Sequence, residues 1–192
     1  MTTTTDTLEH VYNAEGAHAI RDSYDNWATE YDAENIRNGF RLPTIGAAFL
    51  ARHVAPDGGP ILDAGCGTGL VGEALEILGY QAVVGLDISP AMIKRAERLK
   101  SYSRIYEHDL GLPIPEDDNS FGGVTCFGSL GPGHAPPKCL DELVRVTRTG
   151  GYVIFNVRPD TFDDQGLKKK IGELISGSAV REVEQSPNFR PY

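Results

Sequence analysis

Cysteine is scarce in this 192-residue sequence, and its three positions, Cys66, Cys126 and Cys139, are far apart. They form no C-x-x-C pair, and no neighbouring histidine stands at the spacing of a metal ligand. An odd number of separated thiols argues against a disulfide framework, and the missing pairs argue against a zinc site. We therefore expect no metal and a reducing compartment.

Positive charge is also in short supply. The chain has 18 lysines and arginines against 27 aspartates and glutamates, which gives a net charge of −9. Its basic run, Lys168–Lys170, is typical of a solvated helix face. Because a surface of this sign repels phosphate backbones, we expect no nucleic-acid partner.

Long apolar runs are missing as well. No stretch approaches the roughly 20 apolar residues that a membrane-spanning helix needs. The start, Met1–Asp6, lacks the basic and apolar parts of a signal peptide, and the first arginine is Arg21. We expect a cytoplasmic protein that does not enter a membrane.

What is present fits an ordinary globular domain. Hydrophobic residues make up 40% of the chain and charged residues 23%, close to globular averages. We expect one domain over residues 1–192, partly disordered to residue 20 and with a helical lid over 21–55. An α/β body is expected over 60–158 and a shortened C-terminal part over 159–192.

Helical periodicity marks the first part of the chain. Tyr24, Trp27, Ala28 and Tyr31 recur at i, i+3, i+4 and i+7, which predicts a helix from about Arg21 to Asn35. A stripe of this kind is usually the buried face of a docking helix, and that explains Tyr24 and Trp27. The second interpretation is a helix that covers a cofactor, and we weigh it above all for Tyr31, with core packing preferred for Tyr24 and Trp27.

The rest of the chain alternates short apolar runs with helical stretches. This pattern predicts βαβ units and a doubly wound, mostly parallel sheet. Residues 110–120 contain two prolines and are expected to form a loop. The expected strands cover about Pro60–Ala64, Gln81–Leu86, Ser103–His108, Gly122–Phe127 and Gly151–Val157, and the expected helices about Leu42–His53, Gly69–Leu78, Pro90–Lys100 and Pro137–Arg148.

The most informative stretch, Ile61–Gly72, runs from a strand through a glycine-rich turn into a helix. Glycines permit the tight turn and let a ligand approach the backbone amides at a helix N-terminus. Gly67-x-Gly69-x-x-Gly72 matches the dinucleotide fingerprint, and Asp87 follows Gly67 by 20 residues, where an acid would meet a ribose. A nicotinamide-dependent oxidoreductase is therefore one interpretation.

The fuller pattern, Asp63-x-Gly65-x-Gly67-x-Gly69, resembles the class I S-adenosylmethionine-dependent methyltransferases. A carboxylate at Asp63 would repel the pyrophosphate of a dinucleotide, whereas it suits a cofactor with an ammonium and a sulfonium. Val83–Ile93, Glu107–Leu110 and Leu143–Ile154 resemble further motifs of this family, in the right order. The resemblance covers about residues 20–158 and implies a Rossmann-like methyltransferase fold.

The resemblance also implies which residues hold S-adenosylmethionine. Asp87 would bind both ribose hydroxyls, Ile88 and Met92 would flank the adenine, and Asp109 would accept from the adenine amino group. The backbone of Leu110 would donate an amide, while strand four, ending at Phe127, would close the pocket. The methionine part would lie against the loop and the lid helix, at Tyr31, Asp63, Gly65, Cys66 and Gly67.

Two further segments, Tyr24–Asp32 and Gly128–Pro137, resemble a subgroup of small stand-alone methyltransferases. His134 in the second segment is a weak candidate for a general base, against the alternative of a surface histidine. Arg158 is a candidate partner for an anionic acceptor. Cys126 is not expected to be a nucleophile, because Thr125 precedes it where cytosine methyltransferases carry proline.

The C-terminal part departs from the family pattern, which ends in an antiparallel pair of strands. Gly166–Ile175 predicts a helix and Ser178–Glu184 a strand, but no apolar run supplies the last strand. An open sheet edge invites pairing, so we expect a monomer or a weak homodimer. The sequence favours methyl transfer to a small molecule; a non-catalytic cofactor-binding module and the oxidoreductase are the alternatives.

Overall fold

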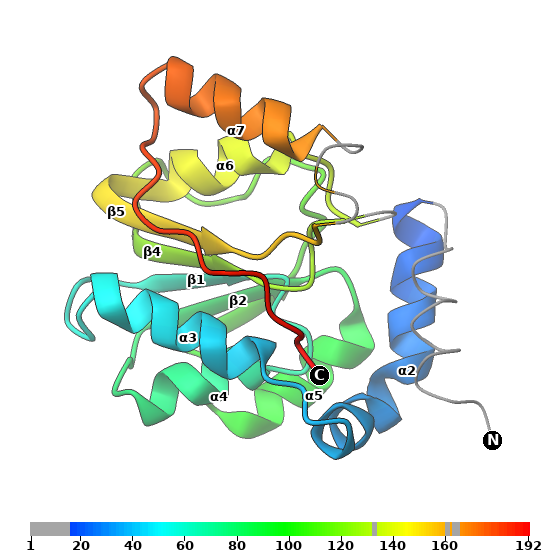
Figure 1. Ribbon diagram of the computed structural model, residues 1–192. Coiled ribbons are helices and arrows are strands. Elements are labelled where there is room, and N and C mark those ends of the chain that lie inside the picture. Colours follow the sequence, from blue (N-terminus) through cyan, green and yellow to red (C-terminus); the bar gives the residue numbers. More distant parts are fainter. Residues whose placement is uncertain (1–15, 132–133, 160–161, 163–165) are drawn as a thin grey trace.

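The computed structural model describes residues 16–131, 134–159, 162 and 166–192, whose helices and strands alternate through most of the chain (Figure 1). Its helices are α2 (Ala17–Arg37), α3 (Leu42–His53), α4 (Leu70–Ile77), α5 (Pro90–Leu99), α6 (Cys139–Val146) and α7 (Leu167–Ser176). Its strands are β1 (Ile61–Ala64), β2 (Val83–Asp87), β3 (Arg104–Glu107), β4 (Phe121–Cys126) and β5 (Thr147–Phe155).

The strands form one sheet in the order β3-β2-β1-β4-β5. Each pair of neighbours among the described strands is parallel. The order reverses at β1, which lies between β2 and β4, so the predicted doubly wound, Rossmann-like α/β fold is confirmed. Ligands of such sheets bind at the carboxyl ends of the strands beside this reversal.

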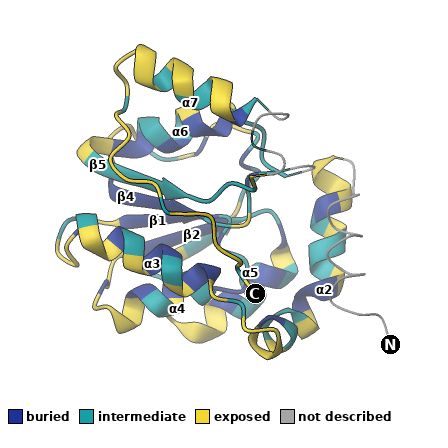
Figure 2. Cartoon of the chain, in the orientation of Figure 1, coloured by how far each residue is buried: buried dark blue, intermediate teal, exposed yellow. Residues whose placement is uncertain are grey.

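The sheet is buried because helices cover both of its faces. Leu140 and Leu143 of α6 pack against one face, while Leu50 of α3 and Leu75 of α4 belong to the apolar cluster on the other. Every residue of β1 and β4 is buried, and Figure 2 shows these strands dark blue between helices with yellow outer surfaces. Burial on both faces explains the continuous apolar runs of these strands.

The connection from β3 to β4 is a loop, as its prolines predicted. Residues 108–120 contain no helix or strand. Arg145 of α6 donates to the carbonyl oxygens of Ile114 at 2.8 Å and Glu116 at 2.9 Å, and Glu142 accepts from the Ile114 amide at 2.8 Å. Side chains of α6 thus satisfy backbone groups that a helix would have paired internally.

The first helix is longer than its aromatic stripe predicted, because α2 begins at Ala17 and ends at Arg37. Trp27 and Ala28 are buried, which confirms the docking face. In Figure 1, α2 stands beyond the carboxyl ends of the strands, and it contacts α5. It is therefore placed to contact a ligand of the sheet.

The predicted end of the helix before β5 at Arg148 is wrong. Helix α6 ends at Val146, and Thr147 already has the extended backbone of β5, with φ −82° and ψ 129°. The Thr147 hydroxyl donates to the Leu143 carbonyl at 2.6 Å and so satisfies one open acceptor of the last turn. This contact closes the helix earlier than its periodicity indicates.

The predicted strand at Ser178–Glu184 is also wrong, because residues 178–192 form no helix or strand. The amides of Ala179 and Val180 point to the Leu174 carbonyl and close α7. Side chains that follow are mostly exposed, so alternation there buries too little apolar surface to hold a strand on β5.

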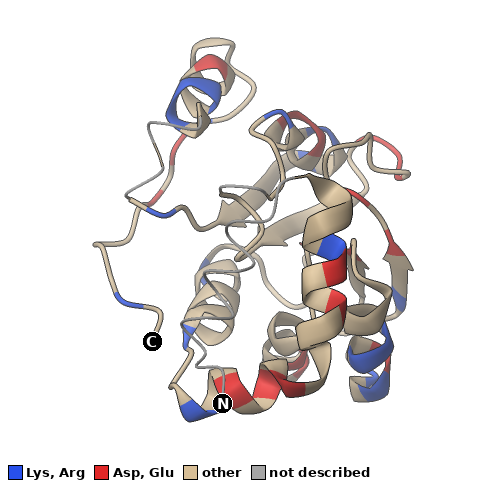
Figure 3. Ribbon diagram, turned by 90° about the vertical axis from the view of Figure 1, so that its right-hand side faces the viewer, with Lys and Arg blue, Asp and Glu red and all other residues tan. Residues whose placement is uncertain are grey.

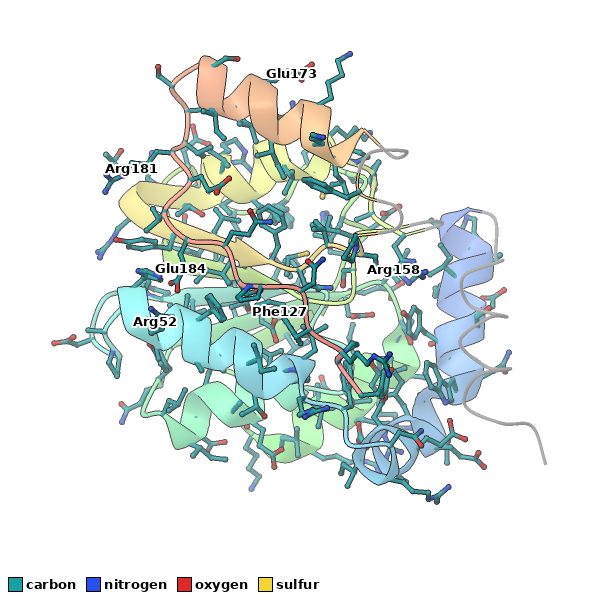
Figure 4. All side chains as sticks on the ribbon, viewed as in Figure 1. Arg52, Phe127, Arg158, Glu173, Arg181 and Glu184 are labelled. Carbon is teal, nitrogen blue, oxygen red and sulfur yellow. The ribbon has the colours of Figure 1, made fainter. Side chains whose placement is uncertain are left out.

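Instead, residues 178–192, the C-terminal tail, cross to α3. Glu184 contacts Arg52 at 2.6 Å and His53 at 3.0 Å, and Arg52 and Glu184 lie side by side in Figure 4. Farther on, the Pro191 carbonyl accepts from the Arg41 amide at 2.8 Å, and Tyr192 stacks on Phe40. The tail therefore packs on helices rather than extending the sheet, and the weak homodimer through a sheet edge stays a prediction.

Among the residues described, no helix is both long and apolar enough to cross a membrane. Figure 3 shows the Lys and Arg segments scattered among Asp and Glu segments in that view. This distribution agrees with the mixed, mainly acidic composition of the sequence.

Candidate functional site

A cavity of about 470 Å³ lies at the carboxyl ends of the strands, between the sheet and α2. Its position is the one expected for a ligand of a doubly wound sheet. Ten of the residues singled out in the sequence line it: Tyr31, Gly65, Gly67, Asp87, Ile88, Met92, Asp109, Leu110, Phe127 and His134.

The floor of the cavity is the turn between β1 and α4. The amides of Gly65 and Cys66 donate to the Leu86 carbonyl at 2.8 and 2.9 Å, which ties the turn to β2. Gly65, Gly67 and Gly69 have φ values of 80°, 53° and 98°, a region that glycine adopts without strain. A Cβ on Gly67 would meet no atom within 4 Å, so the space above it is open.

Asp87, at the end of β2, is fixed by two backbone amides. Its Oδ2 accepts from the Gly67 amide at 2.8 Å, and its Oδ1 accepts from the Ser89 amide at 2.9 Å. Loss of water contact raises the pKa of this carboxyl, and the two hydrogen bonds lower it. The contacts hold both oxygens in place at the cavity wall, where each keeps further acceptor capacity.

Asp63 does not line the cavity, although the sequence placed it among the cofactor residues. It is 1% exposed, and it accepts hydrogen bonds from Tyr102 Oη at 2.7 Å and Thr125 Oγ1 at 2.9 Å. The same Tyr102 oxygen accepts from the Gly72 amide at 3.1 Å. Burial raises the pKa of Asp63 to about 6. Asp63 therefore stabilises the turn and the start of α4 from the protein interior, not from the cavity.

Cys66 is likewise absent from the cavity lining. Its side chain is 5% exposed, and burial, with Asp87 and Asp63 nearby, raises the pKa of the thiol well above its usual value. Burial also raises the pKa of the Cys126 thiol, so neither group is an activated nucleophile. What Cys66 contributes to the site is its backbone amide.

On the β2–β3 side the cavity is flanked by apolar and acidic residues. Ile88 and Met92 line it beside Asp87, and Asp109 and Leu110 line it after β3. Asp109 Oδ1 accepts from the Gly111 amide at 2.7 Å, which shapes the turn that carries both residues. This side combines apolar contact with carboxylate acceptors.

The opposite side is built from α2 and the loop after β4. Tyr24 Oη lies 2.9 Å from His134 Nε2, and their rings meet edge to face at 5.8 Å. This contact joins residues 110 positions apart in the chain. Arg158 does not line the cavity, whereas Lys138 and Ser129 do.

Sequence reasoning missed several lining residues. For Tyr24 core packing was preferred over contact with a ligand, and Ile20 lies one turn before it on the same face of α2, where the i, i+4 spacing was a usable signal. Ser129 and Lys138 carried no motif, because their loop meets α2 only in the folded protein. The other missed residues are Gly16, Ala17, His108, Gly111, Gly128, Ala135 and Pro136.

The described residues fit a nucleoside cofactor that carries an amino acid tail. Asp87 can accept two hydroxyl hydrogen bonds, Ile88 and Met92 can flank a flat base, and open space above Gly67 admits a ligand close to the backbone. By contrast, a pyrophosphate would face Asp87 at the turn, and no Lys or Arg lies among the lining residues of the β1 and β2 turns.

Comparisons with known proteins agree with this geometry. A family model described as a methyltransferase domain matches residues 62–155. Methyltransferase-like protein 27 of Homo sapiens is 33% identical over 141 residues, 72% of this chain and 57% of that protein. Demethylmenaquinone methyltransferase of Clavibacter sepedonicus is 34% identical over 175 residues, 88% of this chain and 71% of that protein.

A solved structure is similar as well. The TehB-like SAM-dependent methyltransferase from Corynebacterium glutamicum ATCC 13032 superimposes with a TM-score of 0.53 at 26% identity, over 73% of this chain and 81% of that chain. The chain spans 57% of the length of Methyltransferase-like protein 27 and of the demethylmenaquinone methyltransferase of Symbiobacterium thermophilum.

Proposed function

The chain belongs to the class I S-adenosylmethionine-dependent methyltransferases, and from that membership we propose that it transfers the methyl group of this cofactor to a small-molecule acceptor. The observation that carries the proposal is Asp87, held by two amides at the wall of a 470 Å³ cavity. The family membership also decides against the nicotinamide-dependent alternative.

The small-molecule part of the proposal rests on the relatives and on the cavity. One relative acts, by its name, on demethylmenaquinone, and others are ubiquinone biosynthesis O-methyltransferases. The cavity is bounded on its outer side by α2, and its volume of about 470 Å³ is within the range of small-molecule sites. The net charge of −9 further disfavours a nucleic acid.

We assign the sides of the cavity to two tasks. Asp87, Asp109 and the amide-rich turn bind and orient the cofactor, with Tyr31 and Phe127 facing the reacting end. When bound, S-adenosylmethionine supplies a methyl group on a sulfonium that is already activated for transfer. Alignment of the acceptor then provides most of the rate, and the buried side chain of Ile20 gives the cavity an apolar wall on the side of α2.

The pair Tyr24–His134 can accept the proton that a protic acceptor releases. A bound cofactor would supply the methyl group, and a protic acceptor would release one proton on being methylated. The proton released by the acceptor passes to Tyr24 Oη while Tyr24 passes its own proton to His134 Nε2. The 2.9 Å contact between Oη and Nε2 supports this route, which leaves His134 as imidazolium.

Calorimetry with S-adenosylhomocysteine and with NAD tests the cofactor assignment on the whole chain. We expect binding of S-adenosylhomocysteine and a gain in stability of about 2.7 kcal/mol at a hundredfold excess over Kd. Binding of NAD without S-adenosylhomocysteine would overturn the proposal. A methyl-transfer screen over phenols, amines and thiols separates the enzyme from a non-catalytic binding module.

A further inference from the structure

Helix α2 carries the dipeptide Tyr-Asp twice, at Tyr24-Asp25 and Tyr31-Asp32. A separation of seven residues is close to two helical turns, so the two tyrosines share one face and the two aspartates share the neighbouring face. Both tyrosines line the cavity. The two aspartates instead contact α5 and the glycine turn.

Asp25 completes the N-terminus of α5. At this end the first helical residue is Pro90, which has no N–H, and the Met92 amide donates to Ser89 Oγ at 3.1 Å. The Ala91 amide between them donates to Asp25 Oδ1 at 3.0 Å, and Ser89 Oγ donates to the same oxygen at 2.5 Å. A carboxylate from α2 thus caps α5, where the helix dipole favours negative charge.

This cap is connected to the cofactor residues. The amide of Ser89 donates to Asp87 Oδ1, and the other oxygen of Asp87 accepts from Gly67. Ser89 is fully buried, so the chain of hydrogen bonds from Asp25 to the glycine turn is shielded from water. Ile88 and Met92, on either side of Ser89, line the cavity.

Asp32 reaches the glycine turn itself. Its Oδ1 accepts from Thr68 Oγ1 at 2.5 Å, and its Oδ2 lies 3.6 Å from Arg95 Nη2 of α5. Thr68 is 2% exposed and stands between two glycines with positive φ. Asp32 therefore binds the glycine turn of the site.

From this arrangement we propose that Asp25 and Asp32 are positioning residues for cofactor binding. They act through Ser89 and Thr68, fix the glycine turn and the first turn of α5, and hold α2 over the cavity. The inference rests on the proposed function and goes beyond it, because it assigns affinity for the cofactor to side chains outside the cavity lining.

Titration with S-adenosylhomocysteine on folded protein tests the proposal. We expect Asp25→Ala and Asp32→Ala to raise Kd about tenfold each, since hydrogen-bonded carboxylates that order a loop contribute on this scale. Asp25→Asn keeps an acceptor oxygen of the same shape and should remain within threefold of wild type. Asp22→Asn, on the same helix with its side chain 66% exposed, is the matched control and should not change Kd.

Two further measurements separate positioning from a structural role. A purely structural role lowers the stability of the ligand-free protein and leaves Kd of the folded protein unchanged. Thr68→Val removes the hydroxyl at nearly constant shape, and it should raise Kd as Asp32→Ala does, with no added loss in the double variant. Kd within twofold of wild type for both Asp25→Ala and Thr68→Val would overturn the inference. Failure of the wild type to bind S-adenosylhomocysteine would instead contradict the proposed function.

Discussion

The two sides of the cavity are built in different ways. On the cofactor side, Asp87 and the glycine turn are fixed by backbone amides of β1, β2 and the turns that follow them. On the acceptor side, Tyr24 and His134 meet through side chains from elements far apart in the chain. Backbone geometry therefore shapes the first side, to which Asp25 and Asp32 of α2 add side-chain contacts, whereas the second side depends on side-chain packing between distant elements.

The largest effect should come from the cofactor side. Asp87→Ala removes a carboxylate that can accept from two ribose hydroxyls, and hydrogen bonds to a charged group contribute about 1.5–3 kcal/mol each. We expect affinity for S-adenosylhomocysteine to fall at least ~100-fold, with Asp87→Asn between this variant and the wild type. Calorimetry on folded protein checks this prediction, with Asp57→Ala in an exposed loop as the control.

A change of less than threefold in Kd for Asp87→Ala would remove Asp87 from the site. Its remaining role would then be local, as an acceptor for the amides of Gly67 and Ser89. In that case the variant would lose stability while it kept its affinity.

The same contrast explains how much could be predicted from the sequence. The glycine turn and Asp87 follow from short-range rules, since a strand, a turn and a helix in sequence place them at the sheet edge without further information. Nine of the residues that the family resemblance and the helix stripe offered for the cofactor line the cavity. The parallel sheet and the loop over 110–120 follow from the same local signals.

The failures have a common physical cause. Asp63 was expected at the ligand, but partners from outside its motif, Tyr102 and Thr125, turn it away from the cavity. The strand at Ser178–Glu184 was expected from the family pattern, which does not show that α3 binds Glu184 instead. Contacts between distant segments decide such positions, and no spacing within a motif reports them.

The stabilising role of buried Asp63 at the glycine turn can be tested through its pH dependence. Its folded pKa of about 6 lies above the usual 3.8, so the folded state binds this proton more tightly than the unfolded state. The contribution of Asp63 to the free energy of unfolding is therefore greatest below about pH 4 and falls as pH rises to about 6. The difference amounts to about 3 kcal/mol.

Denaturant unfolding of wild type and Asp63→Asn from pH 4 to pH 7 measures this contribution. The stability of the wild type relative to the variant should decrease across that range and level off above about pH 6. A relative stability that is independent of pH would show that Asp63 titrates as an exposed carboxyl does.

Alanine substitution of two glycines, one on each side of the cavity, allows the two sides to be compared directly. Gly67 and Gly128 both line it, both have positive φ, and a Cβ on either would meet no atom within 4 Å. Substitution by alanine therefore costs similar backbone strain, about 1 kcal/mol, at each position. Gly67→Ala should raise Kd for S-adenosylhomocysteine about tenfold, because its methyl group enters the cofactor space, whereas Gly128→Ala should raise it less than twofold. Equal effects in calorimetry would show that the two sides are not distinct.

The smallest effect on cofactor affinity should come from Tyr24→Phe. This variant keeps the ring that stacks near Trp27 and faces the cavity, but it loses the hydrogen bond from Oη to His134. Removal of one hydrogen bond at a half-buried site should lower stability by about 1 kcal/mol. Because the cofactor is held from the opposite side, Kd for S-adenosylhomocysteine should change less than twofold.

His134→Gln should behave in the same way, while both variants slow transfer to any protic acceptor found in the screen. If instead Tyr24→Phe weakened the cofactor as much as Gly67→Ala, the tyrosine would belong to the cofactor side, and the proton route through His134 would lose its support.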